Sequence, residues 1–107
     1  MPQPYAPTQP ERSAIDAMPG TVALEFGTDW CGYCRAGTPL IAAAVAGVAG
    51  VTHIKVEDGP GRALGRSFRV KLWPTLVVLH HGQEVARVVR PADERDVRQA
   101  LAKAGSA

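Results

Sequence analysis

The hydrophobic positions of this chain fall into two patterns that alternate along its length. Short runs rich in β-branched and aromatic residues are typical of strands, whereas apolar residues three and four positions apart are typical of one helical face. Strands are predicted at Thr21–Gly27, Val51–Glu57, Thr75–His80 and residues 84–89. Helices are predicted at residues 11–18, between Trp30 and Gly47, at residues 62–68 and after Asp93.

The longest predicted helix presents a single apolar face. The residues of that face are Leu40, Ile41, Ala44, Val45 and Val48. Pro39 lacks the N–H group that a helix interior uses, so we expect a kink or a local break there. Gly47 and Gly50 are expected to end the helix.

Capping residues mark the ends of two further helices. Thr8 and Glu11 have the spacing of a capping box for the first helix. Asp93 is expected to cap the last helix. The apolar face of that helix consists of Val97, Ala100, Leu101 and Ala104.

The order of these elements predicts an α/β fold. A helix between the first two strands makes them parallel, and a tight turn around Gly82 makes the last two antiparallel. We therefore expect a mixed four-stranded sheet with helices on both faces. Residues 1–10 contain four prolines and are expected to form an extended, mobile lead-in, with room for a short fifth strand, before a domain at residues 11–107.

Composition excludes several classes of function. The 107 residues are 46% hydrophobic, enough for one small packed domain. Twelve Lys and Arg against ten Asp and Glu give a net charge of +2, too balanced to indicate nucleic acid or an anionic membrane as a partner. The longest apolar stretch, residues 40–48, is far shorter than a membrane span. Without a visible signal segment, we expect a cytoplasmic protein. Nothing in the sequence suggests an obligate dimer, so we expect a monomer.

Two cysteines, Cys31 and Cys34, lie where the first strand gives way to the long helix. Cys31, at the start of the helix, receives free backbone N–H groups and the positive end of the helix dipole, which favour the nucleophilic thiolate. Cys34 lies one turn deeper, within reach of a disulfide to Cys31. It is the candidate resolving thiol, which displaces a mixed disulfide formed on Cys31.

The pair of cysteines has three alternative interpretations: part of a zinc site, a structural disulfide and inert core thiols. A zinc site needs two more ligands, for which the three candidates are His53, His80 and His81. A structural disulfide across so short a loop constrains the unfolded chain little, and inert core thiols fit poorly with a helix start. A redox-active dithiol is favoured, and neither a metal nor a cofactor is expected. The second functional hypothesis is a binding, scaffold or redox-sensor module without efficient turnover.

The motifs between residues 21 and 104 resemble the thioredoxin family. The sequence Trp30-Cys31-Gly32-Tyr33-Cys34 is similar to the family's WCGPC active site, with Tyr33 in place of the proline. Further matches are the helix proline Pro39, the Trp73-Pro74-Thr75 loop and the hairpin glycine Gly82. The resemblance implies a thioredoxin fold with a cis bond before Pro74.

The resemblance also implies an activity, a thiol–disulfide oxidoreductase in which Cys31 attacks and Cys34 resolves. Trp30, Trp73 and Pro74 would contact the substrate. The alternatives are ordinary packing for the two tryptophans and a strand-opening proline for Pro74. Protein disulfides would be the substrates and a reductase the electron donor. Because the centre is also similar to that of bacterial disulfide isomerases, the direction of electron flow stays open.

Glu25 is out of pattern in its strand. Alternation places Val22, Leu24 and Phe26 on one face and Glu25 on the other, although a central strand covered by helices should be apolar on both faces. The resemblance places Glu25 and Lys55 where the family has a buried aspartate and a buried lysine. It implies that Glu25 takes the proton from Cys34; a structural ion pair with Lys55 is the alternative.

The chain also departs from the family pattern. The usual first strand has no clear counterpart. Gly27 stands where the family often has a second tryptophan, and Arg90 stands where a glycine commonly lines the substrate groove.

Overall fold

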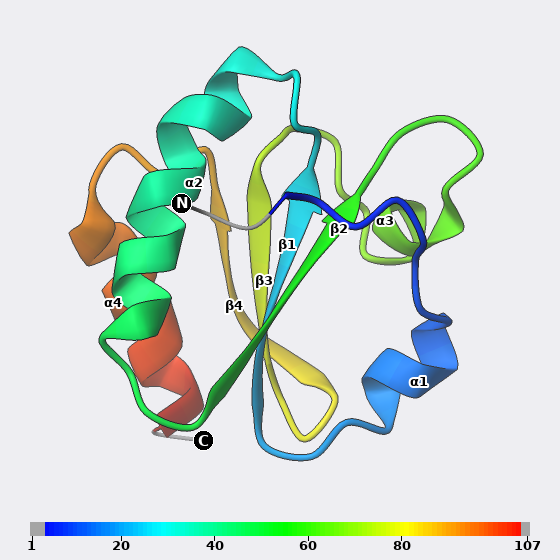
Figure 1. Cartoon of the computed structure of the whole chain (residues 1–107). Coiled ribbons are helices and arrows are strands. Elements are labelled where there is room, and N and C mark those ends of the chain that lie inside the picture. Colours follow the sequence, from blue (N-terminus) through cyan, green and yellow to red (C-terminus); the bar gives the residue numbers. More distant parts are fainter. Residues whose placement is uncertain (1–3, 106–107) are drawn as a thin grey trace.

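The computed structural model describes residues 4–105. Residues 1–3 of the expected lead-in and residues 106 and 107 of the expected domain lie outside this part. The elements, in chain order, are α1 (Arg12–Asp16), β1 (Thr21–Gly27), α2 (Gly32–Ala46), β2 (Val51–Glu57), α3 (Ala63–Ser67), β3 (Thr75–His80), β4 (Gln83–Val89) and α4 (Glu94–Gly105) (Figure 1). The predicted strands and helices are therefore confirmed, with small changes at their ends.

The four strands form one mixed sheet in the order β2-β1-β3-β4. β1 pairs in parallel with β2 and antiparallel with β3, and β3 pairs antiparallel with β4. Helices α2 and α4 cover one face of the sheet, and α1 and α3 lie toward the other (Figure 1). The predicted α/β architecture with a four-stranded sheet is confirmed, and it is the thioredoxin fold.

Each face of the sheet has its own hydrophobic cluster. Val22, Leu24 and Phe26 of β1 pack with Ile15 of α1 and Leu64 of α3. On the other face the cluster joins the sheet to α2 and α4. Its buried members are Ala23, Ile41, Ala44, Leu76, Val78, Val97, Ala100, Leu101 and Ala104. The alternation expected for β1 is confirmed, because it follows from the pleat of a strand between two helical layers.

Helix ends agree with the sequence in α4 but not in α1. The Arg95 N–H donates to Asp93 Oδ1 at 2.7 Å, which confirms Asp93 as a cap. Helix α1 has only five residues, and its N-cap is Glu11 without a side-chain cap bond, so the capping box of Thr8 and Glu11 is wrong. A capping box needs its first residue at the N-cap, and the helix begins three residues too late for Thr8.

Helix α2 runs from Gly32 to Ala46 through Pro39 and ends at Gly47, its C-cap. The expectation of a local break at Pro39 is wrong. Ile41 and Ala44, which follow the proline, are fully buried against the sheet. This burial favours a continuous helix over the conformational preference of a single proline.

The β3–β4 hairpin turns on His81 and Gly82, both with positive φ, of 48° and 81°. Such a pair is typical of a two-residue hairpin turn. A Cβ at Gly82 would lie 2.0 Å from the Asp16 carbonyl oxygen, so α1 packs against a turn that only glycine can form.

The N-terminal segment packs on the domain. Tyr5 is 4% exposed. Ala6 pairs with β2 in one isolated parallel bridge, since the Ala6 N–H donates to the Lys55 carbonyl at 3.0 Å and the Glu57 N–H to the Ala6 carbonyl at 2.9 Å. The buried Tyr5 ring and these two hydrogen bonds attach this part of the lead-in to the sheet. The short fifth strand is reduced to this single bridge.

Candidate active site

The two cysteines differ sharply in exposure. Cys31 is the N-cap of α2 and is partly exposed, whereas Cys34, in the first turn, is 2% exposed. Both are free thiols. The loop of residues 28–30 connects β1 to α2 and brings the dithiol to the end of the sheet. This is the arrangement predicted for an attacking thiol and a shielded one.

Electrostatics separate the two thiols further. Partial burial raises the pKa of Cys31, but hydrogen bonds from the backbone and thiol of Cys34, the Tyr33 N–H and the charge of Arg90 outweigh it and hold this pKa below its ordinary value. Burial raises the pKa of Cys34 to about 11, against hydrogen bonds from the Thr28 N–H and Tyr5. Near neutral pH the thiolate therefore forms preferentially on Cys31.

The loop that opens β3 lies next to the first turns of α2. The Trp73–Pro74 peptide bond is cis. A Cβ at Gly37 of α2 would lie 2.8 Å from Pro74 Cγ, so helix and loop are in direct contact. Trp73 Nε1 donates to Asp58 Oδ2 at 2.9 Å, which fixes the indole.

Two tryptophans form an aromatic surface beside the dithiol. The Trp30 ring is 69% exposed and meets the partly buried Trp73 ring edge to face, with centroids 5.9 Å apart. Trp30, which directly precedes Cys31, thus meets Trp73, and the neighbouring Pro74 contacts α2 three residues after Cys34.

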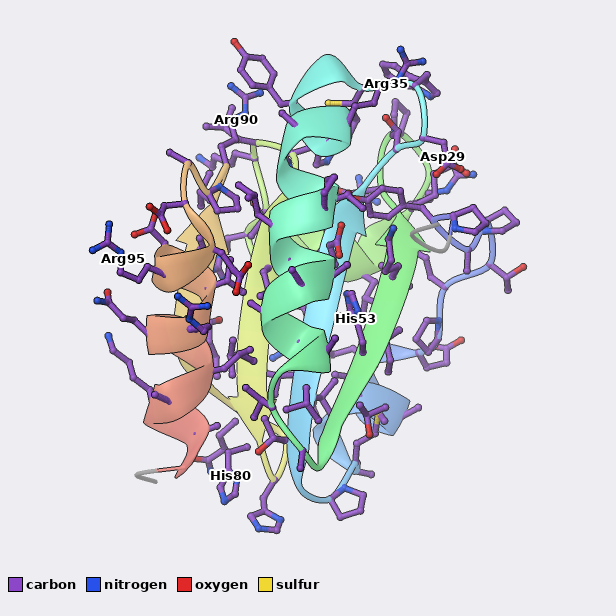
Figure 2. The ribbon with its side chains drawn as sticks, turned by 60° about the vertical axis from the view of Figure 1, so that its left-hand side comes forward. Asp29, Arg35, His53, His80, Arg90 and Arg95 are labelled. Atoms are coloured by element: carbon purple, nitrogen blue, oxygen red, sulfur yellow. The ribbon has the colours of Figure 1, made fainter. Side chains whose placement is uncertain are left out.

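Arg90 is a site residue that the sequence showed only as a departure from the family. Its guanidinium lies 3.7 Å from the centroid of the exposed Tyr33 ring. Its Nε donates to the Trp73 carbonyl at 2.9 Å. Figure 2 shows Arg90 near the end of the molecule where α2 begins and His80 at the opposite end, so the histidines of the hairpin lie far from the dithiol.

Glu25 is fully buried beneath the dithiol and is held by three side chains. Tyr5 Oη donates to Glu25 Oε2. Thr38 Oγ1 donates to the same oxygen at 3.0 Å, and His53 Nε2 lies 2.9 Å from Oε1. Lys55, the register partner of Glu25 on β2, places Nζ 4.4 Å from the centroid of the Tyr5 ring.

Sequence reasoning missed Tyr5 and His53. His53 lies two residues before Lys55 on the same strand, so alternation alone places both on one face. Nothing comparable indicates Tyr5, whose contacts with Glu25 and Thr38 span 20 and 33 positions of the chain.

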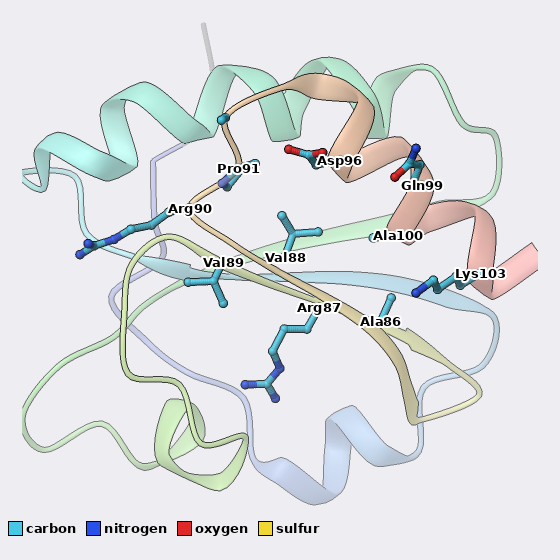
Figure 3. Close-up of a pocket in the computed structure, with 11 residues that line it drawn as sticks. Ala86, Arg87, Val88, Val89, Arg90, Pro91, Asp96, Gln99, Ala100 and Lys103 are labelled. Atoms are coloured by element: carbon cyan, nitrogen blue, oxygen red, sulfur yellow. The ribbon is translucent and has the colours of Figure 1, made fainter.

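A cavity of about 410 Å³ lies between β4 and α4 (Figure 3). Arg90 and Pro91 are among its lining residues, together with Val88, Asp96 and Lys103. Neither cysteine lines it, so it is separate from the dithiol. Within residues 4–105 no group of three or more His, Cys, Asp or Glu side chains is placed to hold a metal ion, and no helix is long and apolar enough to cross a membrane.

An open mixed sheet that carries a CxxC dithiol at a helix N-terminus, opposite a cis-proline loop, defines a thiol–disulfide oxidoreductase. The family model for thioredoxin matches residues 9–103. The chain belongs to the thioredoxin family.

Individual relatives agree with this assignment. A thioredoxin of Chlamydia trachomatis is 30% identical over 93 residues, which cover 87% of this chain and 91% of that protein. A thioredoxin of Chlamydia pneumoniae is 35% identical over 70% of this chain and 74% of its own length. The reduced form of thioredoxin 2 from Pseudomonas aeruginosa PAO1 is 49% identical, with a TM-score of 0.86 over 100% of both chains.

Proposed function

We propose that this protein reduces or exchanges protein disulfides, with Cys31 as the attacking thiolate and Cys34 as the resolving thiol. The observation that carries the proposal is the contrast between the two sulfurs: one partly exposed with a lowered pKa, the other buried with a pKa raised to about 11. Cys31 attacks one sulfur of the substrate disulfide, forms a mixed disulfide and releases the other sulfur as a thiolate. Cys34 then attacks Cys31 Sγ and releases the remaining substrate sulfur.

The second step needs a proton acceptor, because Cys34 is protonated near neutral pH. Glu25 is the acceptor we propose, since it is a fully buried carboxylate bonded to the Tyr5 hydroxyl, which lies with Cys34 Sγ above Gly27. Lys55, the partner of Glu25 across the β1–β2 pair, has its ammonium beside the Tyr5 ring.

Trp30, Trp73 and Pro74 form the surface that we propose for substrate binding. Trp30 offers an exposed apolar face directly before Cys31. Trp73 is fixed by its hydrogen bond to Asp58 and supports Trp30 from the side. An apolar surface of this kind suits partly unfolded or extended protein segments around a disulfide.

The proposed partners follow from the chemistry. A protein that donates two electrons from its dithiol needs to be reduced again, and we propose a reductase as the donor. The same direction of electron flow requires a reducing compartment, for which we propose the cytoplasm. We propose that the protein acts as a monomer, since each step uses groups of one chain.

Reduction of insulin disulfides in the presence of dithiothreitol tests this function. We expect turnover well above the dithiothreitol background, its loss in Cys31→Ser, and accumulation of a mixed disulfide in Cys34→Ser. A rate equal to the background would favour a binding or redox-sensor module instead. The equilibrium constant with glutathione then distinguishes a reductase from an oxidant or isomerase.

A further inference from the structure

The Tyr5 hydroxyl and the Cys34 sulfur line the same small space above Gly27. A Cβ at Gly27 would lie 2.7 Å from Cys34 Sγ and 2.7 Å from Tyr5 Oη. Tyr5 comes from the N-terminal segment, and its ring is buried against the sheet. A phenol hydroxyl therefore reaches the buried, resolving side of the dithiol.

The same hydroxyl is bonded directly to Glu25. It donates to Glu25 Oε2, and it lies 2.9 Å from Thr38 Oγ1. The Tyr5 side chain also lowers the pKa of the Cys34 thiol, against the larger effect of burial. Tyr5 is thus bonded to the group that we propose to receive the proton, and it shares the space above Gly27 with the group that loses it.

The other oxygen of Glu25 is already engaged. Oε1 lies 2.9 Å from His53 Nε2. A carboxylate only accepts hydrogen bonds, so His53 is the donor in this pair. Figure 2 shows His53 beside α2, and its side chain is 21% exposed. With Oε1 held in this way, Oε2 is the oxygen on which an incoming proton is placed, on the side of Tyr5.

We propose that Tyr5 relays the proton of Cys34 to Glu25 during resolution of the mixed disulfide, a role that rests on the function proposed above for Glu25. The S–H proton of Cys34 moves to Tyr5 Oη while the Oη proton moves to Glu25 Oε2. Cys34 Sγ forms its bond to Cys31 Sγ, and the bond from Cys31 to the substrate sulfur breaks. The substrate sulfur leaves with the electron pair as a thiolate, and Tyr5 ends as a neutral phenol.

Charged and titratable neighbours set the conditions for this relay. Lys55 Nζ lies over the Tyr5 ring from β2, and the Asp29 carboxylate accepts the Tyr5 backbone N–H at 3.1 Å. Cys31 faces Cys34 from the same helix and is neutral, as part of the mixed disulfide, when the proton moves. Desolvation raises the pKa of Tyr5 far above its ordinary value, which keeps the phenol protonated and able to act as a relay.

Ellman's reagent separates the two chemical steps in a single stopped-flow trace. Attack of Cys31 on the reagent releases the first nitrothiobenzoate, and resolution by Cys34 releases the second. Tyr5→Phe keeps the ring above Gly27 but removes the relay oxygen. We expect the first phase to stay within about twofold and the second to slow by about a hundredfold, the lower end for a positioned proton-transfer group.

Thr38→Val is the matched control, because it also removes a hydroxyl donor to Glu25 Oε2. Thr38 is not among the groups that act on Cys34, so we expect the second phase to slow less than about threefold. Equal slowing in Tyr5→Phe and Thr38→Val would overturn the relay, since it would mean that both hydroxyls merely hold Glu25. Near-ultraviolet circular dichroism and a thermal melt verify that both variants are folded.

The dependence of the second-phase rate on pH distinguishes a proton relay from a structural role of Tyr5, because a structural role would not change this dependence. We expect the second phase of the unmodified protein to vary little between about pH 6 and about pH 8, because the acceptor is internal. In Tyr5→Phe the proton goes to solvent, and the rate should rise about tenfold per pH unit. A flat profile in Tyr5→Phe overturns the relay.

Glu25→Gln separates failure of the relay from failure of the function proposed for Glu25. The relay is supported if resolution is slow in both Tyr5→Phe and Glu25→Gln and if the variant that combines them is no slower than the slower of the two. Slow resolution in Glu25→Gln with a normal rate in Tyr5→Phe overturns the relay alone. A normal rate in Glu25→Gln overturns both, because the relay would then have no acceptor.

Discussion

The Tyr5 ring occupies the space that Gly27 leaves empty at the end of β1. Tyr5 Cζ and Oη each lie 2.7 Å from the position of a Cβ on Gly27. This is where the family often has a second tryptophan in the sequence. Here an aromatic ring reaches the same place from the N-terminal segment, and it carries a hydroxyl to the buried side of the dithiol.

Gly27→Ala is expected to disturb this packing. A methyl group would overlap both Tyr5 and Cys34, so the ring or the sulfur has to move. Overpacking of this kind destabilises a core by about 1–3 kcal/mol. Urea denaturation of the reduced protein measures the free energy of unfolding. Gly47→Ala is the control, because its Cβ meets only ordinary contacts at 3.6 Å and beyond and should change stability by less than about 1 kcal/mol. Equal stability of the two variants would show that the Tyr5 ring is not held over Gly27.

Arg90→Gln is expected to raise the pKa of Cys31, since the guanidinium charge is one of the influences that lower it. Alkylation by iodoacetamide below that pKa should slow about twofold to fivefold, in line with a surface charge interaction of less than about 1 kcal/mol. Mass spectrometry should find the label on Cys31 before Cys34. Arg95→Gln removes the same charge from a remote position (Figure 2) and should leave the rate unchanged. Arg90→Lys keeps the positive charge and should restore most of the alkylation rate. Equal alkylation rates in Arg90→Gln, Arg95→Gln and Arg90→Lys would contradict the effect assigned to the Arg90 charge on Cys31.

The stability of the reduced protein is expected to fall in alkaline solution. The pKa of Cys34 is about 11 in the folded protein, above the value of about 8.5 for a thiol in an unfolded chain. The folded state therefore holds this proton more tightly. Its contribution to stability is complete below about pH 8.5 and is lost as the pH rises through about 11. Cys31 acts in the opposite sense only below about pH 8.5, where its lowered pKa makes stability rise with pH.

Urea denaturation of the reduced protein across this range measures the loss, which we expect to reach about 3 kcal/mol. Cys34→Ser retains Cys31 and the lysines but lacks the buried thiol, so subtracting its profile isolates the contribution of Cys34. If stability falls with pH equally in the unmodified protein and in Cys34→Ser, burial does not raise the pKa of Cys34.

The sheet could be predicted from the sequence because it depends on local pattern. The strands of residues 51–57 and 75–80 carry β-branched residues between turn signals, and each pairs in the direction that the crossover and hairpin dictate. The exposure of Cys31 and burial of Cys34 followed from their places at the start of a helix and one turn into it. Local chemistry and helix geometry were sufficient for both.

The support beneath the dithiol could not be predicted in the same way. Tyr5 and Glu25 meet through a contact that spans 20 residues, and no periodicity relates a proline-rich segment to a strand interior. Arg90 shows the same limit, because its stacking on Tyr33 depends on how the end of β4 reaches the start of α2. Packing in three dimensions decides these contacts.

Trp73→Ala is expected to affect bulky substrates more than small ones. The indole supports the exposed Trp30 ring edge to face and is fixed by Asp58, so its removal weakens the apolar surface beside Cys31 without touching either sulfur. We expect kcat/KM for insulin to fall about tenfold, the loss typical of an aromatic residue central to a contact surface. The rate with a small disulfide such as hydroxyethyl disulfide should change less than about twofold, since it needs no such surface.

Two control variants accompany this measurement. Trp73→Phe keeps a ring against Trp30, and its kcat/KM for insulin should be intermediate. Val48→Ala removes another exposed apolar side chain, at the far end of α2, and should change neither rate. Trp73→Ala also removes the Nε1 donor to Asp58, which lowers the free energy of unfolding by about 1–3 kcal/mol. Both assays are therefore run at a temperature well below the melting temperature of the variant. An equal fall for insulin and for the small disulfide would make Trp73 a packing residue of the site and not a part of its substrate surface.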